Sequence, residues 1–135
     1  MSLDPILLIG GSGVIGRSTA RFLRAVHPDV PLLIGGRDLA KAKEVATEIG
    51  GAEGVVLDLA ADDLGIGEHP VSAVAVFPKD DRIAVLRFAQ THGVPHISIS
   101  GGITEIGAEV AAYMHKPDAA AVVLGAEWLV GATTV

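Results

Sequence analysis

The sequence contains no cysteine among its 135 residues. A disulfide framework, a thiol nucleophile and a cysteine-ligated metal site are therefore excluded. Aromatic residues make up only 4% of the chain and charged residues only 19%, whereas half of the residues are hydrophobic. We therefore expect an aliphatic interior of valine, isoleucine, leucine and alanine, of the kind that fills the space between a sheet and its helices.

Basic residues and long hydrophobic runs are also scarce. Ten Lys and Arg residues against sixteen Asp and Glu residues give a formal charge of −6, and no basic face or arm is visible, so we expect no nucleic-acid partner. The longest charge-free apolar stretch near the C-terminus, residues 119–126, is far shorter than the ~20 residues that a membrane helix needs. The N-terminus lacks the basic region with which a signal peptide begins, so we expect no signal peptide. We expect a single domain over residues 1–135, with no membrane contact and a cytoplasmic location.

Glycine, in contrast, is abundant, and the N-terminal glycines form a motif. The apolar run at residues 6–9 predicts a buried parallel strand, and the following G-x-G-x-x-G leads into a helical period. The first glycine suits a tight turn, the second lets a pyrophosphate approach the backbone, and the third lets the helix pack close to the sheet. We predict a dinucleotide site at this turn, the alternative being a glycine-rich turn without a ligand. The predicted contacts are Gly11, Ser12, Gly13, Val14, Ile15 and Gly16.

Strand and helix patterns alternate along the rest of the chain. Helical periods reach about His27, continue from a cap at Asp38 to Ile49, start again at Asp80, and run from a cap at Thr104 to Met114. This alternation predicts parallel pairing through right-handed crossovers, and the fingerprint selects a doubly wound Rossmann sheet of about six strands in the order 3-2-1-4-5-6. The expected strands are residues 6–9, 30–34, 54–59, 71–77, 96–100 and 119–124.

The residues after the second expected strand bear on the choice of cofactor. An NAD site places an acidic residue about 20 positions past the fingerprint, where it bonds the adenine ribose. Here Gly36 and Arg37 occupy that place, and a guanidinium matches a ribose 2′-phosphate. We therefore favour NADP over NAD. The alternative is that Asp38 turns inward and selects NAD, although a role as helix cap is the more economical interpretation.

Three further positions lie at strand ends. Asp58 lies at the end of the third expected strand, where Rossmann proteins bind the adenine ring of the cofactor. The alternative is that Asp58 is an ordinary aspartate at a strand end, because the sequence pattern is the same in both cases. Phe77 and Pro78 end the fourth strand and are predicted to flank the ribose on the nicotinamide side, or to be plain core and turn residues.

No catalytic residue is predicted. Tyr113 and Lys116 have the spacing Tyr-x-x-Lys rather than the Tyr-x-x-x-Lys of short-chain dehydrogenases. Ser12 and Ser98 could serve as nucleophiles, but neither has a histidine at a spacing typical of a nucleophile and its base. The five histidines are scattered without the spacing of a metal site, and we expect them on the surface or in loops.

Together, Gly-Gly-Ser-Gly-Val-Ile-Gly, Gly-Gly-Arg-Asp before a helix, Val-Leu-Asp-Leu, and Val-Pro-His-Ile-Ser-Ile-Ser-Gly at residues 94–101 resemble the N-terminal NADP-binding domain of the saccharopine dehydrogenase-like proteins, over nearly the whole chain. The resemblance implies that residues 11–16 hold the pyrophosphate, Arg37 the 2′-phosphate, Asp58 the adenine, and the Phe77-Pro78 turn the ribose or nicotinamide side.

The sequence departs from that family in two respects. His96 and Ser98 stand where the family tends to have Tyr and Asp, and the family continues beyond its sixth strand into a substrate and dimerisation domain. The resemblance therefore implies the cofactor domain of an oxidoreductase, completed by a substrate domain or subunit that this chain lacks. The alternative is a stand-alone dinucleotide-binding or sensing module without catalysis.

The C-terminal residues 124–135 form an unusually apolar end. They include Trp128, Leu129, Val130 and Val135 with a single charge at Glu127, whereas a solvated terminus is normally polar. We expect this segment to pack either on the sheet of its own chain or against a second copy in a homodimer.

Overall fold

A computed structural model describes residues 3–99 and 102–125, and within them six strands alternate with four helices. All pairs of neighbouring strands are parallel, and the strand order is β3-β2-β1-β4-β5-β6. The predicted doubly wound order is thereby confirmed. The elements are β1 (Ile6–Ile9), α1 (Val14–Val26), β2 (Leu32–Gly36), α2 (Leu39–Ile49), β3 (Ala52–Val56), β4 (Ala73–Val76), α3 (Ala84–His92), β5 (His96–Ser98), α4 (Ile103–His115) and β6 (Val122–Val123).

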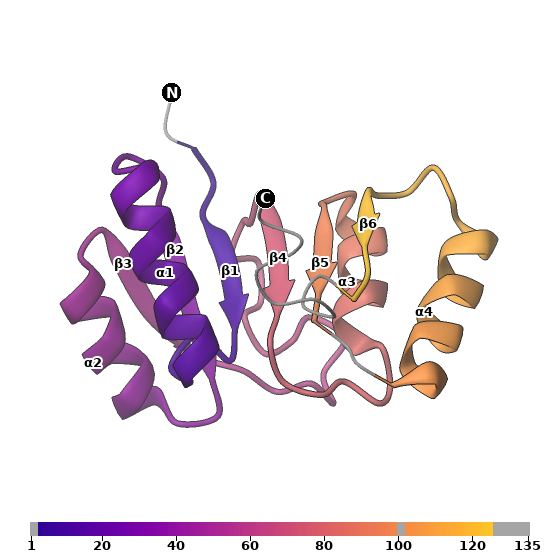
Figure 1. The fold of residues 1–135 in the computed structure, drawn as a ribbon, viewed down its shortest axis with the longest axis horizontal. Helices are drawn as coiled ribbons and strands as arrows, with labels where there is room; N and C mark the ends of the chain where they lie inside the picture. The colour runs from indigo at the N-terminus through magenta and orange to yellow at the C-terminus, as the bar shows by residue number, and fades with distance from the viewer. Residues whose placement is uncertain (1–2, 100–101, 126–135) are drawn as a thin grey trace.

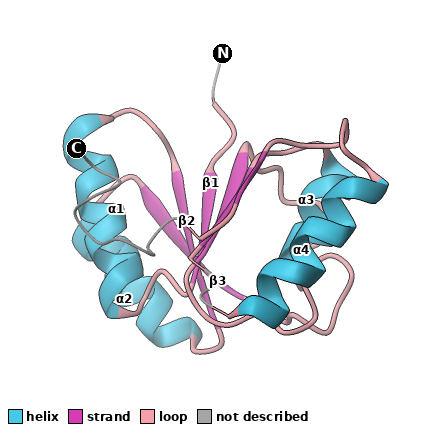
Figure 2. Cartoon of the chain, turned by 45° about the vertical axis from the view of Figure 1, so that its right-hand side comes forward, coloured by secondary structure: helices cyan, strands magenta, loops and turns pink. Residues whose placement is uncertain are grey.

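The helices form two layers, one on each face of the sheet. Helices α1 and α2 lie on one face, and α3 and α4 lie on the other (Figures 1 and 2). Every strand runs in the same direction, so the carboxyl ends of all six strands meet at the lower edge of the sheet in Figure 1. No helix among the described residues is long and apolar enough to cross a membrane.

Several elements begin or end away from the predicted positions, each because a side chain or turn competes for the backbone. Strand β3 ends at Val56 rather than at residue 59, because the Asp58 amide donates to the Leu64 carbonyl and its carboxylate accepts from the Ala60 amide. Asp80 does not start α3. Its carboxylate accepts from the Val85 amide at 2.9 Å, and the left-handed backbone of Ile83 (φ 49°) delays the helix until Ala84.

Helix α4 begins one residue before the predicted cap. The residue at the cap position is Gly102 rather than Thr104, and the Glu105 carboxylate accepts a hydrogen bond from the Gly102 amide at 3.0 Å. A glutamate at the third helical position satisfies an amide that the helix leaves without a partner. The boundary is therefore set by the glutamate, a signal that is present in the sequence.

The hydrophobic core consists of two halves separated by the sheet. Alternate residues of each strand point to opposite faces, so the same strands supply both halves. The half beneath α3 is centred on Leu7, Ile9, Val74, Val76, Val85 and Phe88. The half beneath α1 and α2 is centred on Leu8, Ala20, Ile34, Ala42, Val45 and Ala75.

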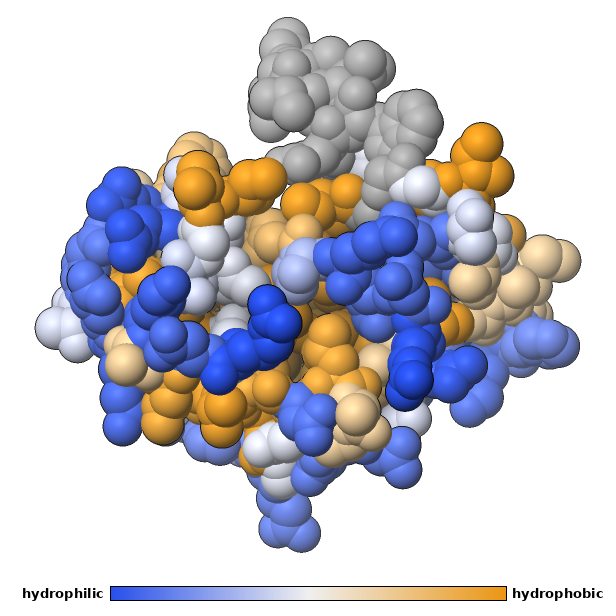
Figure 3. Space-filling view, turned by 90° about the horizontal axis from the view of Figure 1, so that it is seen from below, coloured by the Kyte–Doolittle hydropathy of each residue, from blue (hydrophilic) through white to orange (hydrophobic). Residues whose placement is uncertain are grey.

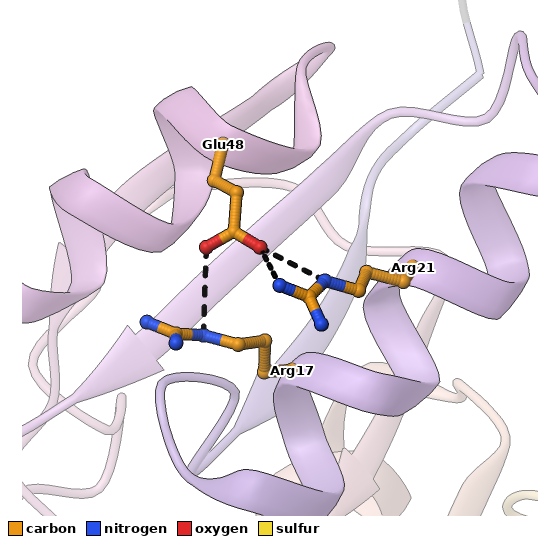
Figure 4. A network of polar contacts seen from close by, with 3 residues as sticks. All are labelled: Arg17, Arg21 and Glu48. Carbon is orange, nitrogen blue, oxygen red and sulfur yellow. Dashed lines mark hydrogen bonds and ion pairs between the residues drawn. The ribbon is translucent and has the colours of Figure 1, made fainter.

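An ion-pair network joins α1 to α2, the two helices that cover the core half around Leu8 and Ile34 (Figure 4). Arg21 of α1 donates two hydrogen bonds to Glu48 of α2, and Arg17 lies 3.6 Å from the other carboxylate oxygen. Hydrogen bonding from Arg21 holds the pKa of Glu48 below its ordinary value. These side chains are partly exposed, so the network fixes how the helices align rather than supplying much stability.

Gly54 allows α2 to pack directly against β3. A Cβ at this position would lie 2.5 Å from the backbone nitrogen of Lys43 and 2.7 Å from the carbonyl carbon of Ala42. Backbone atoms cannot rotate away as the end of a side chain can, so any larger residue must displace the helix from the strand.

We predict that Gly54→Ala lowers the free energy of unfolding by about 1–3 kcal/mol, because α2 must move away from β3. The matched control is Gly107→Ala in α4, where a Cβ meets nothing within 4 Å. Alanine is the better helix former by about 1 kcal/mol, so the control should be as stable as the natural chain or more so. Urea unfolding followed by circular dichroism measures both. Equal stabilities for the two variants would contradict the proposed tight contact.

Candidate functional site

A cavity opens at the edge where the carboxyl ends of the strands meet. Its volume is about 860 Å³, within the usual range for small-molecule sites. Figure 3, which looks onto this edge, shows hydrophobic patches and hydrophilic residues side by side across the middle of the face. The lining residues come from the ends of β1 to β4 and from the start of α1: Ile9, Gly10, Ser12, Gly13, Val14, Ile15, Gly16, Gly36, Arg37, Leu57, Asp58, Leu59, Ala60, Phe77, Pro78 and Lys79.

Two of the fingerprint glycines are needed by the turn itself. A Cβ at Gly11 would lie 2.9 Å from the carbonyl oxygen of Leu8, and one at Gly16 would lie 2.4 Å from the carbonyl oxygen of Gly10. Gly16 therefore lets the first turn of α1 rest directly on the loop that follows β1. Gly11 is buried within this turn and does not line the cavity.

Gly13 differs from its two neighbours in the motif. Its backbone has φ −77° and ψ 176°, which any residue can adopt, and a Cβ there meets only the Gly10 carbonyl oxygen, at 3.3 Å. Gly13 is exposed and lines the cavity. The fold by itself therefore does not strongly require glycine at position 13. A ligand bound close to the backbone would require it, because a side chain would occupy the same space.

The N-terminus of α1 offers positive charge to this cavity. Gly13 precedes the helix and has no side chain to cap it, and the first turn contains no acidic residue. The first amides of a helix have no partner within the helix, and its dipole places partial positive charge at this end. Val14, Ile15 and Gly16 of this turn all line the cavity. Such an arrangement binds anions, phosphate groups in particular.

Arg37 and Asp38 follow β2 but face different surroundings. Arg37 is exposed, lines the cavity beside Gly36, and forms no hydrogen bond or ion pair with residues 3–99 or 102–125. The Asp38 carboxylate accepts from the Lys41 amide at 3.1 Å and caps α2, and Asp38 is not among the lining residues. The guanidinium is therefore the charged group available to a ligand here, and the carboxylate is engaged by the helix.

Asp58, Phe77 and Pro78 all line the cavity. Asp58 is exposed, and one carboxylate oxygen accepts from the Ala60 amide at 2.9 Å, which fixes the loop after β3. The Phe77 amide donates to the Ile9 carbonyl, and Pro78 is so close to the first loop that a Cβ on Gly10 would lie 2.7 Å from its Cδ. The loops after β1 and β4 thus form adjoining walls.

Sequence reasoning missed six of the lining residues: Ile9, Gly10, Leu57, Leu59, Ala60 and Lys79. Most of them flank predicted residues at a strand end, so extending each prediction by one or two positions would have found them. Lys79 follows Phe77 and Pro78 directly and forms ion pairs with Asp81 at 3.0 Å and Glu105 at 3.6 Å. The hydrogen bond to Asp81, together with these charges, raises the pKa of Lys79, so it is a cation at neutral pH.

His96 is not the loop or surface histidine that the sequence suggested. It begins β5, is 2% exposed, and its Nδ1 has no hydrogen-bond partner among the described residues. Burial lowers its pKa to about 4, against the opposing influence of Asp80 and a backbone hydrogen bond. His96 is therefore neutral at physiological pH. In residues 3–99 and 102–125, no group of three or more His, Asp or Glu side chains is placed to hold a metal ion.

We predict that His96 makes the fold sensitive to acid. The unfolded chain binds its proton near the ordinary pKa of 6.5 and the folded chain only near 4, so between these values protonation favours unfolding. Stability from this group is complete above the unfolded pKa and is lost as pH falls towards the folded one. Lowering the pH from 7 to 5 should cost up to about 2 kcal/mol through His96 alone.

The measurement is urea unfolding of the natural chain and of His96→Phe at both pH values. The phenylalanine has a similar size and no titratable group, so the loss of stability between pH 7 and 5 should be smaller in the variant. An identical loss in the two proteins would show that His96 does not titrate in this range.

No protein-family model matches this sequence, and no curated protein sequence matches it. Solved structures do resemble the fold. Saccharopine dehydrogenase (L-Glu forming) from Saccharomyces cerevisiae has a TM-score of 0.72 at 17% identity, covering 90% of this chain and 27% of that protein. A short-chain dehydrogenase/reductase from Vibrio parahaemolyticus has a TM-score of 0.68 at 14% identity, covering 88% and 76% respectively.

A third similar structure is dTDP-glucose 4,6-dehydratase from Bacillus anthracis, solved in complex with NAD. Its TM-score is 0.67 at 12% identity, over 89% of this chain and 54% of that protein. Identities this low establish the fold and nothing finer. The chain spans about a quarter of the yeast saccharopine dehydrogenase that it resembles.

Proposed function

We propose that this chain is the NADP-binding domain of a saccharopine dehydrogenase-like oxidoreductase. The observation that carries the proposal is the arrangement at Gly13: an exposed backbone position that leaves space in front of a helix N-terminus, at the carboxyl edge of a parallel sheet. This is where proteins of this architecture bind dinucleotides. The fold shared with dehydrogenases and reductases supports the same conclusion.

The pyrophosphate belongs at the start of α1. It would be held by backbone amides and by the helix dipole rather than by charged side chains, and the glycine at position 13 admits it to within contact distance. Ser12, Val14, Ile15 and Gly16 border the same space. Gly11 contributes indirectly, by forming the turn that orients these residues.

Arg37 supports NADP rather than NAD. It lies on the cavity beside Gly36, where the ribose 2′-substituent of a dinucleotide belongs, and no acidic partner among the described residues neutralises it. A guanidinium forms charge-assisted hydrogen bonds with a phosphate dianion. Asp38, the residue that could have selected NAD, caps α2 instead.

The remaining residues divide the cavity between the two ends of the cofactor. Asp58, after β3, would border the adenine, and Phe77 and Pro78, after β4, would border the ribose on the nicotinamide side. When bound, a nicotinamide cofactor supplies hydride transfer. The chain's own residues would bind and orient it, and, as the resemblance to the saccharopine dehydrogenase-like proteins implies, a further domain or subunit would supply the acid or base and the substrate wall.

We predict that Gly13→Val abolishes NADPH binding and leaves the fold largely intact. The isopropyl group would occupy the space that the pyrophosphate needs, whereas the backbone at position 13 already has dihedral angles that valine adopts. Isothermal titration calorimetry measures binding and circular dichroism measures folding.

The control for Gly13→Val is Ser18→Val, which places the same side chain on an exposed position of α1 away from the cavity. The control should bind like the natural chain. A folded Gly13→Val protein that still binds NADPH would show that the glycine turn has a structural role only, and the proposed function would be withdrawn.

We predict that NADPH binds more tightly than NADH and that Arg37→Ala removes the difference. A hydrogen bond to a charged group contributes ~1.5–3 kcal/mol, which corresponds to a loss of roughly 10- to 100-fold in NADPH affinity with little change for NADH. Arg87→Ala removes an equal charge from an exposed residue of α3 outside this cavity and should leave the preference unchanged. Equal affinities of the natural chain for both cofactors would rule out Arg37 as the selecting residue.

A further inference from the structure

A second cavity is bordered by α3 and α4, the two helices on the sheet face opposite α1 and α2 (Figure 2). Its volume is about 890 Å³, within the range of small-molecule sites. Its lining comes from both helices and from the loop after β3. The Gln90 side chain of α3 lines it and donates to the Ala112 carbonyl of α4 at 3.1 Å, which joins the two helices at the cavity wall.

Basic side chains dominate the charge of this second cavity. Arg82, Arg87, His115 and Lys116 line it, and Asp62 is the one acidic residue of the lining. The chain as a whole carries a formal charge of −6, so this local excess of positive charge runs against the composition. A concave surface lined mainly by one sign of charge concentrates its field and attracts ligands of the opposite sign.

The three permanent cations of the second cavity are free to bind a ligand. Arg82, Arg87 and Lys116 are exposed, and their side chains form no hydrogen bond or ion pair with the described part of the chain. The other two arginine sites of comparable exposure on α1 behave differently, because Arg17 and Arg21 are both paired with Glu48.

The acidic residues that precede Arg82 in the chain are engaged by other groups. The Asp80 carboxylate accepts from the Val85 amide at 2.9 Å, and Asp81 forms an ion pair with Lys79 at 3.0 Å. Neither carboxylate forms an ion pair with Arg82. The guanidinium of Arg82 therefore keeps its charge available although two aspartates are its sequence neighbours.

Beneath these cations the second cavity is apolar. Ile83 and Phe88 line it and are only 7% and 2% exposed, so they lie deeper than the exposed basic residues. Three alanines of α4 also line it: Ala108, Ala111 and Ala112. The cavity thus combines an apolar interior with positive charge at its opening, which suits a ligand that has an apolar body and anionic groups.

We propose that the second cavity binds a small organic anion with an apolar body and at least two negative charges, carried by carboxylates or by a phosphate. The planar guanidinium groups of Arg82 and Arg87 match the geometry of both kinds of oxyanion, and Lys116 adds a third positive charge from α4. The apolar body would lie against Ile83 and Phe88.

This site is separate from the cofactor cavity. The two linings have Leu59 and Ala60 in common and otherwise consist of different residues, so the proposal does not depend on the proposed function. Nor does it involve the apolar C-terminal segment, whose expected packing falls on residues 126–135, outside the described part of the chain.

An acidic segment of a partner protein is the other ligand that this charge could attract. A stable protein interface buries about 800 Å² on each partner, whereas the feature observed here is a recess with the volume of a small-molecule site. The observations therefore favour a small ligand, and a peptide is included in the test.

The first experiment titrates the ¹⁵N-labelled protein with phenyl phosphate and with phthalate, at a slightly alkaline pH where both are dianions. Each carries an aromatic body, and they represent the two kinds of oxyanion. Millimolar concentrations of at least one should shift the NMR signals of the Thr91, Ala111 and Ala112 amides, and the tighter ligand identifies the preferred oxyanion. Benzyl alcohol, which has the ring without the charge, should not shift them.

The second experiment repeats the titration with variants. Arg87→Gln removes one charge from an exposed residue without a partner, so the protein should stay folded by circular dichroism and bind roughly tenfold more weakly. The matched control is Lys43→Gln on α2, which removes a charge from an exposed residue outside the cavity and should bind like the natural chain. Arg37→Ala should also leave this binding unchanged, which separates the result from that of the cofactor cavity.

Three results would overturn the proposal. The first is that neither dianion shifts the three amides. The second is that folded Arg87→Gln binds the dianions as tightly as the natural chain does. The third is that a glutamate-rich peptide shifts these amides while neither small dianion does, which would assign the cavity to a protein partner.

Discussion

The close approach of α1 to the loop after β1 is the contact on which the rest of the molecule depends. Because Gly16 has no Cβ, the first turn of the helix rests on the backbone of Gly10 and Gly11, within the distance that any side chain would occupy. This contact fixes the helix N-terminus at the carboxyl edge of the sheet. It also sets the position of α1 over β1, from which Arg17 and Arg21 reach Glu48 and align α2.

The candidate site follows from that contact because most of it is backbone. The amides at the start of α1 and the open position at Gly13 offer phosphate binding without a charged side chain, so the chemistry is supplied by chain geometry. Under the proposed function, charged side chains at the margin of the cavity would add selectivity for the ligand. Arg37 is the clearest case, because it faces the cavity without an acidic partner among the described residues while its neighbour Asp38 is engaged by α2.

The same placement of α1 leaves the sheet asymmetric. The side of α1 that carries Arg17 and Arg21 meets α2, whereas Ile97 of β5 and Val123 of β6 lie exposed on the same face of the sheet.

The sequence by itself determined the order of strands and helices, the parallel sheet and the glycine turn, because these depend on local periodicity and on the spacing of residues that are near one another in the chain. It also located most of the cavity, since strand ends in a doubly wound sheet converge at one edge. Only the tertiary structure decided that His96 is buried and neutral, and that Lys79 joins the cavity. Each of these depends on which distant elements surround a side chain, and a one-dimensional pattern contains no record of burial or of the direction in which a strand-end residue turns.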